Sequence, residues 1–221
     1  RCEEVKSGVI LSGGIDSSLI SYYASKENHH NFLHLDSLDS SELSFAKHVA
    51  KDLNISLMTD YIDEKRFFEN LQQTVEAWEY PMVHTNGVGI LLLAKLAKRL
   101  GIKVLLGGES ADELFGGYYY YSYSHLTSFL PNSFKSKFSR SNNLIKFLNY
   151  SVPSNSNSIS NNFAHRVQNF NNIFDKYITF LPNNQAVTQS LMLADITDYL
   201  QPLLSRADRL MMSEGIELRM P

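Results

Sequence analysis

The chain of 221 residues carries 20 basic and 23 acidic side chains, 43% of its residues are hydrophobic, and it has a single cysteine, Cys2. These values are typical of a globular protein and exclude collagen-like, coiled-coil and wholly disordered chains. The formal net charge of −3 gives no general attraction to nucleic acid or to an anionic membrane. One cysteine permits neither an internal disulfide nor an all-cysteine metal site, which suits the reducing cytoplasm.

Nothing in the sequence predicts a membrane or export segment. No window of about eighteen apolar residues could span a bilayer. The charged start, Arg1–Glu4, lacks the apolar stretch of a secretory signal. Because there is no initiator methionine and a patterned stretch runs up to Pro221, we expect both ends to be cuts through a longer protein. We predict a cytoplasmic location.

Strand and helix patterns alternate over the first hundred residues. Short apolar runs predict strands, and helical spacing of apolar side chains predicts helices. In chain order these are a strand at 9–11, a helix at 16–26, a strand at 32–35, a helix at 41–53, a strand at 55–62, helices at 67–78 and 87–100, and a strand at 103–106. The alternation is typical of βαβ units. We therefore predict a Rossmann-like α/β fold, in which helices cover both faces of a parallel sheet.

The composition changes after about residue 122. Of the 35 residues from 128 to 162, 18 are serine or asparagine, and the stretch is basic without any acidic residue. Such a segment is typical of a solvated, partly flexible insertion; the alternative is a basic flap over a phosphate-bearing substrate. Helical spacing returns from Ala186. We therefore predict an α/β core at 1–125, an insertion at 126–185 and a helical part at 186–221 that is truncated at its end.

A glycine-rich turn follows the first predicted strand. The string Ser12–Gly13–Gly14–Ile15–Asp16–Ser17–Ser18 lies between that strand and the next helix. Glycine lets the backbone turn sharply and approach phosphate oxygens, and the positive end of the helix favours an anion. Asp16 would repel a phosphate unless Mg²⁺ lies between them. The string lacks the Gly-Lys-Ser/Thr of a Walker loop, and a simpler interpretation is a turn in which Asp16 or Ser17 caps the helix.

A second glycine block follows the last predicted strand of the core. Residues 107–118 read Gly-Gly-Glu-Ser-Ala-Asp-Glu-Leu-Phe-Gly-Gly-Tyr. Ligands gather outside the carboxyl ends of parallel strands, so we expect the two blocks to converge on one crevice. Glu109 and Asp112 lie three residues apart near a helix start and can face the same side. Asp112 could share a metal with Asp16, and Glu109 could accept a proton. Alternatively, Asp112 and Glu113 are there because the helix dipole favours acids in a first turn.

Together, the blocks resemble a known family. The first string resembles the PP-loop of ATP pyrophosphatases, which split ATP between the α and β phosphates and hold the pyrophosphate in this loop. Both blocks resemble the synthetase domain of the asparagine synthetase family, which carries Ser-Gly-Gly-x-Asp-Ser-Ser and later Gly-Glu-x-x-Asp-Glu-x-Phe-Gly-Gly-Tyr. A third block matches in the same order, with Tyr199, Leu200, Leu203, Leu204, Asp208, Arg209, Met212, Glu217, Arg219 and Pro221. The resemblance covers residues 6–121 and 190–221, and it implies a PP-loop (adenine nucleotide alpha hydrolase) fold whose core, 1–125, binds ATP.

The resemblance implies a role for each matching residue. The pyrophosphate part of ATP would be held by Ser12, Gly13, Gly14, Asp16, Ser17 and Ser18, and the adenosine would be contacted by Leu11, His34, Gly107 and Gly108. Asp16 and Asp112 would bind Mg²⁺, and Glu109 would join them as a catalytic residue needed for synthesis. Family members often carry an apolar residue where His34 stands, so a structural histidine is the alternative. Glu217 and Arg219 would form a supporting ion pair.

The implied reaction is ATP-dependent amide synthesis of the asparagine synthase type, by an AMP- and pyrophosphate-forming carbon–nitrogen ligase. A carboxylate, aspartate by default, attacks the α-phosphorus of ATP, and ammonia then displaces AMP from the acyl-adenylate. The ammonia would come from glutamine, in a glutaminase domain of the same polypeptide outside this chain. The other predicted partners are small molecules, without nucleic acid or membrane, and the family also allows a homodimer.

Departures from the family pattern leave alternatives open. Gly107 replaces a usual serine and Ser110 a usual glycine, which are small-for-small changes. Residues 78–86 differ from the asparagine synthetases in a region that helps to hold the amino acid, so the acceptor could be another carboxylate. β-Lactam-forming relatives usually carry tyrosine where Glu109 stands, and a tRNA-thiolating PP-loop enzyme needs catalytic cysteines. A natural-product or polysaccharide amidotransferase and a non-catalytic nucleotide-binding module are further alternatives.

Overall fold

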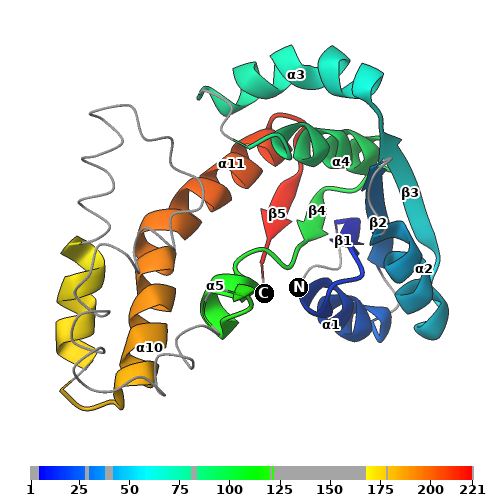
Figure 1. Ribbon diagram of the computed structural model, residues 1–221. Helices are drawn as coiled ribbons and strands as arrows, with labels where there is room; N and C mark the ends of the chain where they lie inside the picture. The colour runs from blue at the N-terminus through cyan, green and yellow to red at the C-terminus, as the bar shows by residue number, and fades with distance from the viewer. Residues whose placement is uncertain are drawn as a thin grey trace. The chain divides into compact units, whose positions relative to one another are not determined.

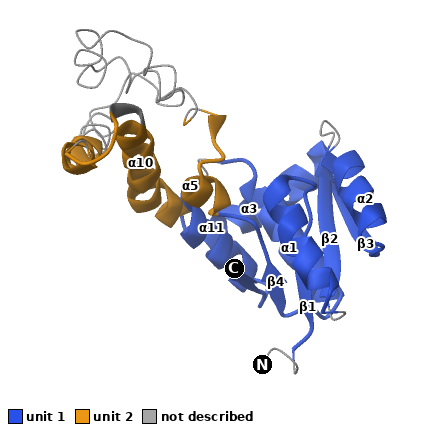
Figure 2. Ribbon diagram, turned by 90° about the horizontal axis from the view of Figure 1, so that it is seen from below, with its two compact units in different colours: residues 1–109, 203–221 blue, residues 110–202 orange. Residues whose placement is uncertain are grey.

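The computed structural model describes residues 5–27, 30–37, 42–80, 84–119, 121, 168–177 and 179–220. They belong to two compact units, which are described separately below (Figure 2). Unit 1 comprises residues 1–109 and 203–221, and unit 2 comprises residues 110–202. Within the described ranges, no helix has the length and hydropathy needed to cross a membrane.

Unit 1 is built on a five-stranded sheet. The strands are β1 (Ser7–Ile10), β2 (His30–Ser37), β3 (Leu57–Ile62), β4 (Val104–Leu106) and β5 (Glu217–Arg219). Their order is β3-β2-β1-β4-β5, and every pair is parallel (Figure 1). This confirms the predicted parallel sheet. The edge strand β5 was not predicted, because three residues with two charged side chains show no strand pattern until they pair with β4.

Helices cover both faces of this sheet, as predicted (Figure 1). One face carries α1 (Ile15–Ser25) and α2 (Glu42–Asp52), and the other carries α3 (Glu64–Trp78), α4 (Gly87–Arg99) and α11 (Gln201–Met212). Side chains alternate along a strand, so neighbouring residues of β2 enter different cores. Phe32 packs with Val9 of β1 and Ala24 of α1, whereas Leu33 belongs to a cluster with residues of α4 and α11.

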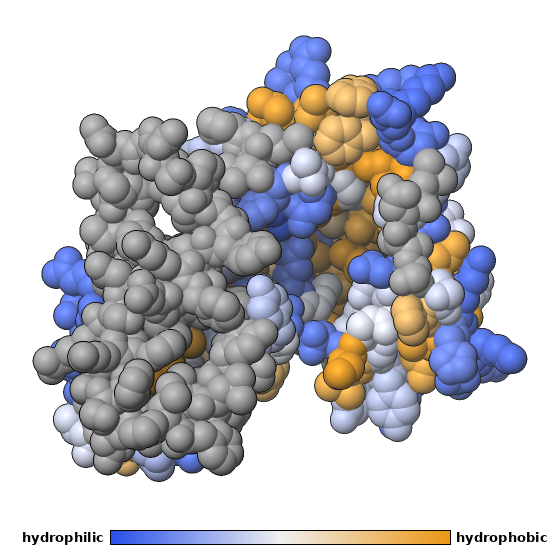
Figure 3. Space-filling model, in the orientation of Figure 1, coloured by the Kyte–Doolittle hydropathy of each residue, from blue (hydrophilic) through white to orange (hydrophobic). Residues whose placement is uncertain are grey.

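Local signals explain where the helices begin and end. Asp63 precedes α3, and its carboxylate accepts a hydrogen bond from the Arg66 N–H at 2.7 Å, which is a typical N-cap. Gly101 follows α4 in a left-handed conformation, with φ of 70°, which is typical of a glycine that ends a helix. Figure 3 shows hydrophobic and hydrophilic side chains next to one another over α3, and Phe68 and Val75 are among its exposed residues.

An ion-pair cluster joins β3 to the following helices. Asp60 accepts hydrogen bonds from Arg66 Nη1 at 2.6 Å and from Arg99 Nη2 at 2.7 Å. The Asp60 and Arg66 side chains are 14% and 22% exposed, so this pair is largely shielded from water, whereas Arg99 is 56% exposed. The hydrogen bond from Arg66 is the largest cause that holds the pKa of the Asp60 carboxyl well below its usual range, and Arg99 and the Tyr61 N–H add to it.

Unit 2 contains α5 (Ala111–Phe115), a helical segment at residues 168–177, α10 (Asn183–Asp195) and a π-helical turn, η2 (Ile196–Leu200). Phe170 and Phe174 pack against Ala186, Val187 and Ala194 of α10. The helical part expected from Ala186 therefore starts three residues earlier, and a helix lies at 168–177 inside the stretch predicted as an insertion. Most of that stretch, residues 122–167, lies outside the described residues, and the three predicted domains stay a prediction.

Candidate functional site

The strand order places both glycine loops at one point of the sheet. From β1 the chain proceeds to β2 and β3 on one side, and later to β4 and β5 on the other. In an open parallel sheet such a reversal leaves a crevice between the carboxyl ends of the two strands, which is where ligands bind. Residues 12–18 follow β1 and residues 107–109 follow β4, so these two loops flank the switch point.

The two loops are in direct contact. A β-carbon added to Gly108 would lie 3.2 Å from Asp16 Cβ and 3.3 Å from the Ser17 nitrogen, which is closer than side chains normally pack. The absence of a side chain at Gly108 is therefore what lets the β4 loop lie against the start of α1. The convergence expected from the sequence is present within unit 1.

Hydroxyl groups hold the first loop together. The Ser12 and Ser17 hydroxyl oxygens are 2.8 Å apart, the Ser12 N–H donates to Ser17 Oγ at 3.2 Å, and the Ser17 hydroxyl donates to the Gly14 carbonyl at 3.2 Å. Gly14 precedes α1, and no side chain caps this helix. Asp16 lies inside the first turn, so the interpretation of Asp16 or Ser17 as the cap is wrong. The first N–H groups of a helix have no partner within it, and here they are available to an anion.

The two glycines of this loop have different reasons to be glycine. Gly13 has φ of 89°, and a β-carbon there would lie 2.6 Å from the Ala46 nitrogen and 2.7 Å from Phe45 Cβ, both in α2. Gly14 has φ of −71°, and a β-carbon there would meet only Ser12 Oγ at 3.5 Å. Gly13 is thus required by backbone conformation and by the packing of α2, whereas Gly14 is not required by either.

The residues assigned to the adenosine lie directly after β1, within β2 and in the β4 loop. Leu11 is buried, and its carbonyl oxygen is 2.8 Å from His34 Nδ1. A carbonyl can only accept, so Nδ1 carries the proton and donates. His34 is 2% exposed, and its Nε2 has no hydrogen-bond partner among the described residues, with Asp36 Oδ1 at 3.9 Å. His34 therefore has the structural contact expected of a core histidine and, in addition, one ring nitrogen without a partner.

The acidic residues of the second block lie on both sides of the boundary between the units. Glu109 is the last residue of this part of unit 1, and it is half-buried directly after Gly108. Asp112 is half-buried in the first turn of α5 in unit 2, where a β-carbon on Gly117 would overlap its carboxylate. Glu113 is buried and accepts a hydrogen bond from the Tyr118 hydroxyl at 2.6 Å. Burial and then this hydrogen bond raise the pKa of Tyr118. The contacts of Glu113 indicate a structural role.

Comparison with known proteins decides the family. The family described as asparagine synthase matches residues 2–221. The chain belongs to the asparagine synthase family. It is 38% identical over 115 residues to "Putative asparagine synthetase [glutamine-hydrolyzing] 1" of Methanocaldococcus jannaschii, which covers 51% of the chain and 21% of the relative. It is 35% identical over 122 residues to "Asparagine synthetase [glutamine-hydrolyzing] 1" of Bacillus subtilis, which covers 53% of the chain and 19% of the relative.

A relative with a different name matches the same share of the chain. "Amidase chry2" of Gibberella zeae is 30% identical over 133 residues, which cover 52% of the chain and 20% of the relative. The chain spans about a fifth of the length of these curated relatives. The family assignment thus holds for the whole chain, and the activity of the complete protein is a matter of proposal.

Few acidic side chains of the described residues are placed to act as metal donors. Within the described ranges, no three histidine, cysteine, aspartate or glutamate side chains form a metal-binding group. Mg²⁺ is usually held by one or two carboxylates together with substrate phosphates, so a three-residue cage is not required. The half-buried Asp16 carboxylate, in the first turn of an uncapped helix, is a suitable donor next to a phosphate.

Of the two departures from the family's second block, one is compatible with the local backbone conformation and the other is strained by it. A β-carbon on Gly107 would meet only the side-chain tips of Leu218 at 3.3 Å and Ile10 at 3.8 Å, so this position could hold a small side chain. Ser110 has φ of 77°, in the left-handed region where the family's glycine is favoured. The serine at this position therefore carries backbone strain.

Sequence reasoning did not single out one buried arginine, which lies between matched residues of the third block. Arg206, in α11, is buried and donates a hydrogen bond to Asn86 Oδ1 at 3.0 Å. Asn86 closes the segment in which this chain departs from the asparagine synthetases. The position of Arg206 between matched residues of that block was the available signal. The ion pair predicted from the same block is confirmed, because Arg219 Nε donates to Glu217 Oε1 at 2.8 Å.

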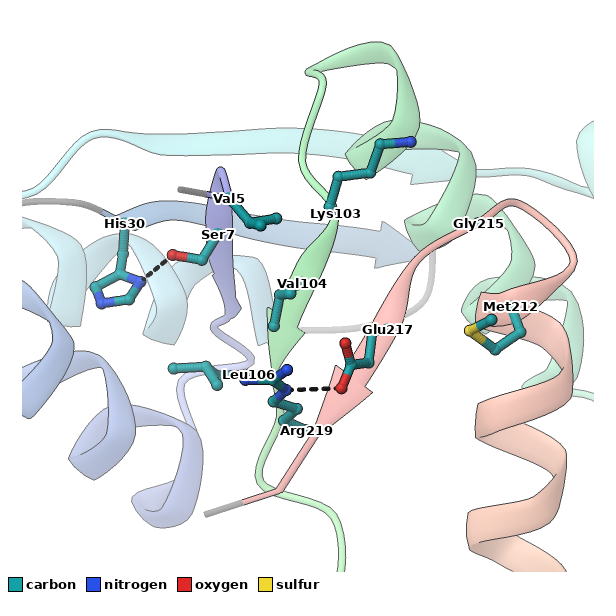
Figure 4. Close-up of a pocket in the computed structure, with 10 residues that line it drawn as sticks. All are labelled: Val5, Ser7, His30, Lys103, Val104, Leu106, Met212, Gly215, Glu217 and Arg219. Atoms are coloured by element: carbon teal, nitrogen blue, oxygen red, sulfur yellow. Dashed lines mark hydrogen bonds and ion pairs between the residues drawn. The ribbon is translucent and has the colours of Figure 1, made fainter. Parts of the chain in front are cut away.

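A separate pocket lies along β4 and β5 (Figure 4). It has a volume of about 490 Å³, and its lining includes Ser7, His30, Val104, Leu106 and Glu217. The Ser7 hydroxyl is 2.9 Å from His30 Nδ1, so both polar groups are already engaged. None of the residues expected to bind ATP lines it, and this pocket is therefore not the candidate site.

Proposed function

We propose that this protein activates a carboxylic acid with ATP and converts the acyl-adenylate into an amide. The proposal is supported most directly by the contact of Gly108 with Asp16 and Ser17, which joins the two glycine loops at the switch point of the sheet. Membership of the asparagine synthase family supports the same chemistry, and the names of two relatives include glutamine hydrolysis.

In this proposal the chain holds ATP through its two loops. The pyrophosphate part lies against residues 12–18 and the first turn of α1, and the adenosine lies against Leu11, His34, Gly107 and Gly108. Asp16 and Asp112 would hold Mg²⁺, which would offset the charge of the phosphates and of the leaving pyrophosphate. Because the backbone N–H groups of α1 are fixed before the substrate arrives, they stabilise that developing charge without reorganisation.

The reaction proceeds in two balanced steps. A carboxylate oxygen of the acceptor, aspartate by default, forms a bond to the α-phosphorus, and the bond between the α-phosphorus and the bridging oxygen breaks to release pyrophosphate. Ammonia then attacks the carbonyl carbon, and AMP leaves with the former carboxylate oxygen. Glu109 accepts the extra proton of the ammonia nitrogen. The ammonia comes from glutamine, which is hydrolysed by a glutaminase domain of the same polypeptide. The homodimer and the cytoplasmic location stay predictions.

Pyrophosphate exchange into ATP tests the proposal in the protein at its full natural length. Exchange in the presence of aspartate is expected, and exchange only with another acid on a panel would reassign the acceptor. No exchange with any acid would favour a non-catalytic nucleotide-binding module. Asp16→Asn should abolish exchange, whereas Glu109→Gln should retain exchange and lose amide formation. Glu69→Gln, an exposed acid in α3, is the charge-matched control; equal behaviour of the Asp16 and Glu109 variants would refute their separate roles.

A further inference from the structure

One buried cation in unit 1 has only a neutral partner. Arg206 is 3% exposed, and the partner of its Nη1 is the side-chain oxygen of Asn86. Its Nε is buried and has no hydrogen-bond partner among the described residues, and no carboxylate of those residues lies within ion-pair distance. By contrast Arg209, which follows on the same helix, pairs with the Glu79 carboxylate. A buried guanidinium without an anion is costly, so an anion is expected to complete this site.

The start of α4 adds a second positive group at the same place. The first turn of this 13-residue helix has no acidic residue, and Asn86, which precedes it, makes no capping hydrogen bond. The Asn86 oxygen accepts from Arg206 instead. The Gly87 and Val88 N–H groups donate to the backbone carbonyls of His84 and Thr85, both at 3.3 Å, so no side-chain acceptor offsets the positive end of the helix dipole. Burial and then the charge of Arg206 lower the pKa of the nearby His84, as expected for a region of positive potential.

This pair lies near the edge of the sheet at which ATP is proposed to bind. α4 leads into β4 and α11 leads towards β5, and both strands run parallel to β1. A helix that precedes a parallel strand begins at the edge where the strands end. Asn86 therefore lies at the same edge of unit 1 as residues 12–18. At that edge, residues 12–18 already offer N–H and hydroxyl donors to the triphosphate. The anion that Arg206 binds is therefore a different one.

We propose that Arg206, oriented by Asn86, binds a carboxylate of the acceptor that is not the one activated. This inference rests on the proposed function. The activated carboxylate must reach the α-phosphorus and cannot also be held by a buried arginine, so the acceptor carries a second acidic group. The planar guanidinium suits a carboxylate, because its N–H groups match the two carboxylate oxygens. Arg206 is thus a specificity-determining residue for dicarboxylic acceptors.

Removal of the second carboxylate from the acceptor tests this directly. In the full-length protein, Arg206→Lys should raise KM for aspartate in pyrophosphate exchange by at least about 30-fold, with KM for ATP unchanged. The same variant should behave like the wild type with 3-aminopropanoate, which is aspartate without its α-carboxylate. A rise in KM for ATP, or an equal loss with both acids, would overturn the assignment.

A second variant distinguishes loss of the carboxylate site from misfolding of the protein. Asn86 is exposed, so Asn86→Asp should leave the fold intact while its new carboxylate occupies Arg206 and raises KM for aspartate at least about tenfold. Arg209→Lys is the matched control and should change neither value. Calorimetric binding of aspartate and of 3-aminopropanoate, with a non-hydrolysable ATP analogue present, needs no turnover. If exchange fails but aspartate binding still depends on Arg206, the proposed function is refuted and the carboxylate site is retained. If aspartate binding does not depend on Arg206, the carboxylate site is refuted.

Discussion

Replacement of Gly13 by alanine should destabilise the protein mainly through α2. Two costs arise at this position. An L-residue at φ of 89° costs about 1–2 kcal/mol, of which about 0.5 kcal/mol is returned because alanine lowers the entropy of the unfolded chain. The new β-carbon would also lie 2.6 Å from the Ala46 nitrogen. Because that atom belongs to helix backbone, α2 must shift, and overpacking of this kind costs about 1–3 kcal/mol.

The expected loss in the free energy of unfolding is therefore about 2–4 kcal/mol for Gly13→Ala. Gly101→Ala is the matched control, since Gly101 has φ of 70° but nothing within 4 Å of an added β-carbon. It should lose only about 1 kcal/mol. Gly14→Ala should change stability by less than about 0.5 kcal/mol, because its φ is negative and its surroundings are open.

The assay is hydrogen exchange of the full-length protein at increasing urea concentrations. Peptides that cover β1 and α2 report the opening free energy of this region, separately from any other domain. The difference between Gly13→Ala and Gly101→Ala isolates the contact with α2. Equal losses in the two variants would refute the argument, because they would show that α2 does not confine the loop.

Three other changes test separate parts of unit 1 and the start of α5. Gly108→Ala should slow pyrophosphate exchange about 10–100-fold, because the added β-carbon displaces Asp16; an unchanged rate would contradict the contact between the loops. Asp60→Asn should lower the free energy of urea unfolding at pH 7 by about 1–2 kcal/mol. The pKa of Asp60 is held below its ordinary 3.8, so the wild type has this contribution above about pH 4 and loses it as the pH falls further, while the variant should show no such loss. Ser110→Gly should raise the unfolding free energy by about 0.5–1 kcal/mol by relief of its φ of 77°, and a fall would show that the serine makes a compensating contact.

The sequence by itself determined the features that depend on neighbouring residues. Alternating apolar runs and helical spacing predicted β1 to β4 and the helices between them, because each pattern reflects one local conformation and one buried face. The glycine strings marked the two loops after β1 and β4, and parallel pairing then required both loops to lie at one edge. The three ordered motifs were sufficient to indicate the family that the whole-chain match later confirmed.

Only the tertiary structure decided the features that depend on residues far apart in the chain. Gly13 and Gly14 look alike in sequence, and it is the packing of α2 that makes the first indispensable. β5 forms a strand because it pairs with β4, which lies more than a hundred residues earlier in the chain. Arg206 meets Asn86 across 120 residues, and no local pattern records that its charge is buried there without an anion. Burial and partnership of a charge follow from strand order and helix packing, which a local motif does not encode.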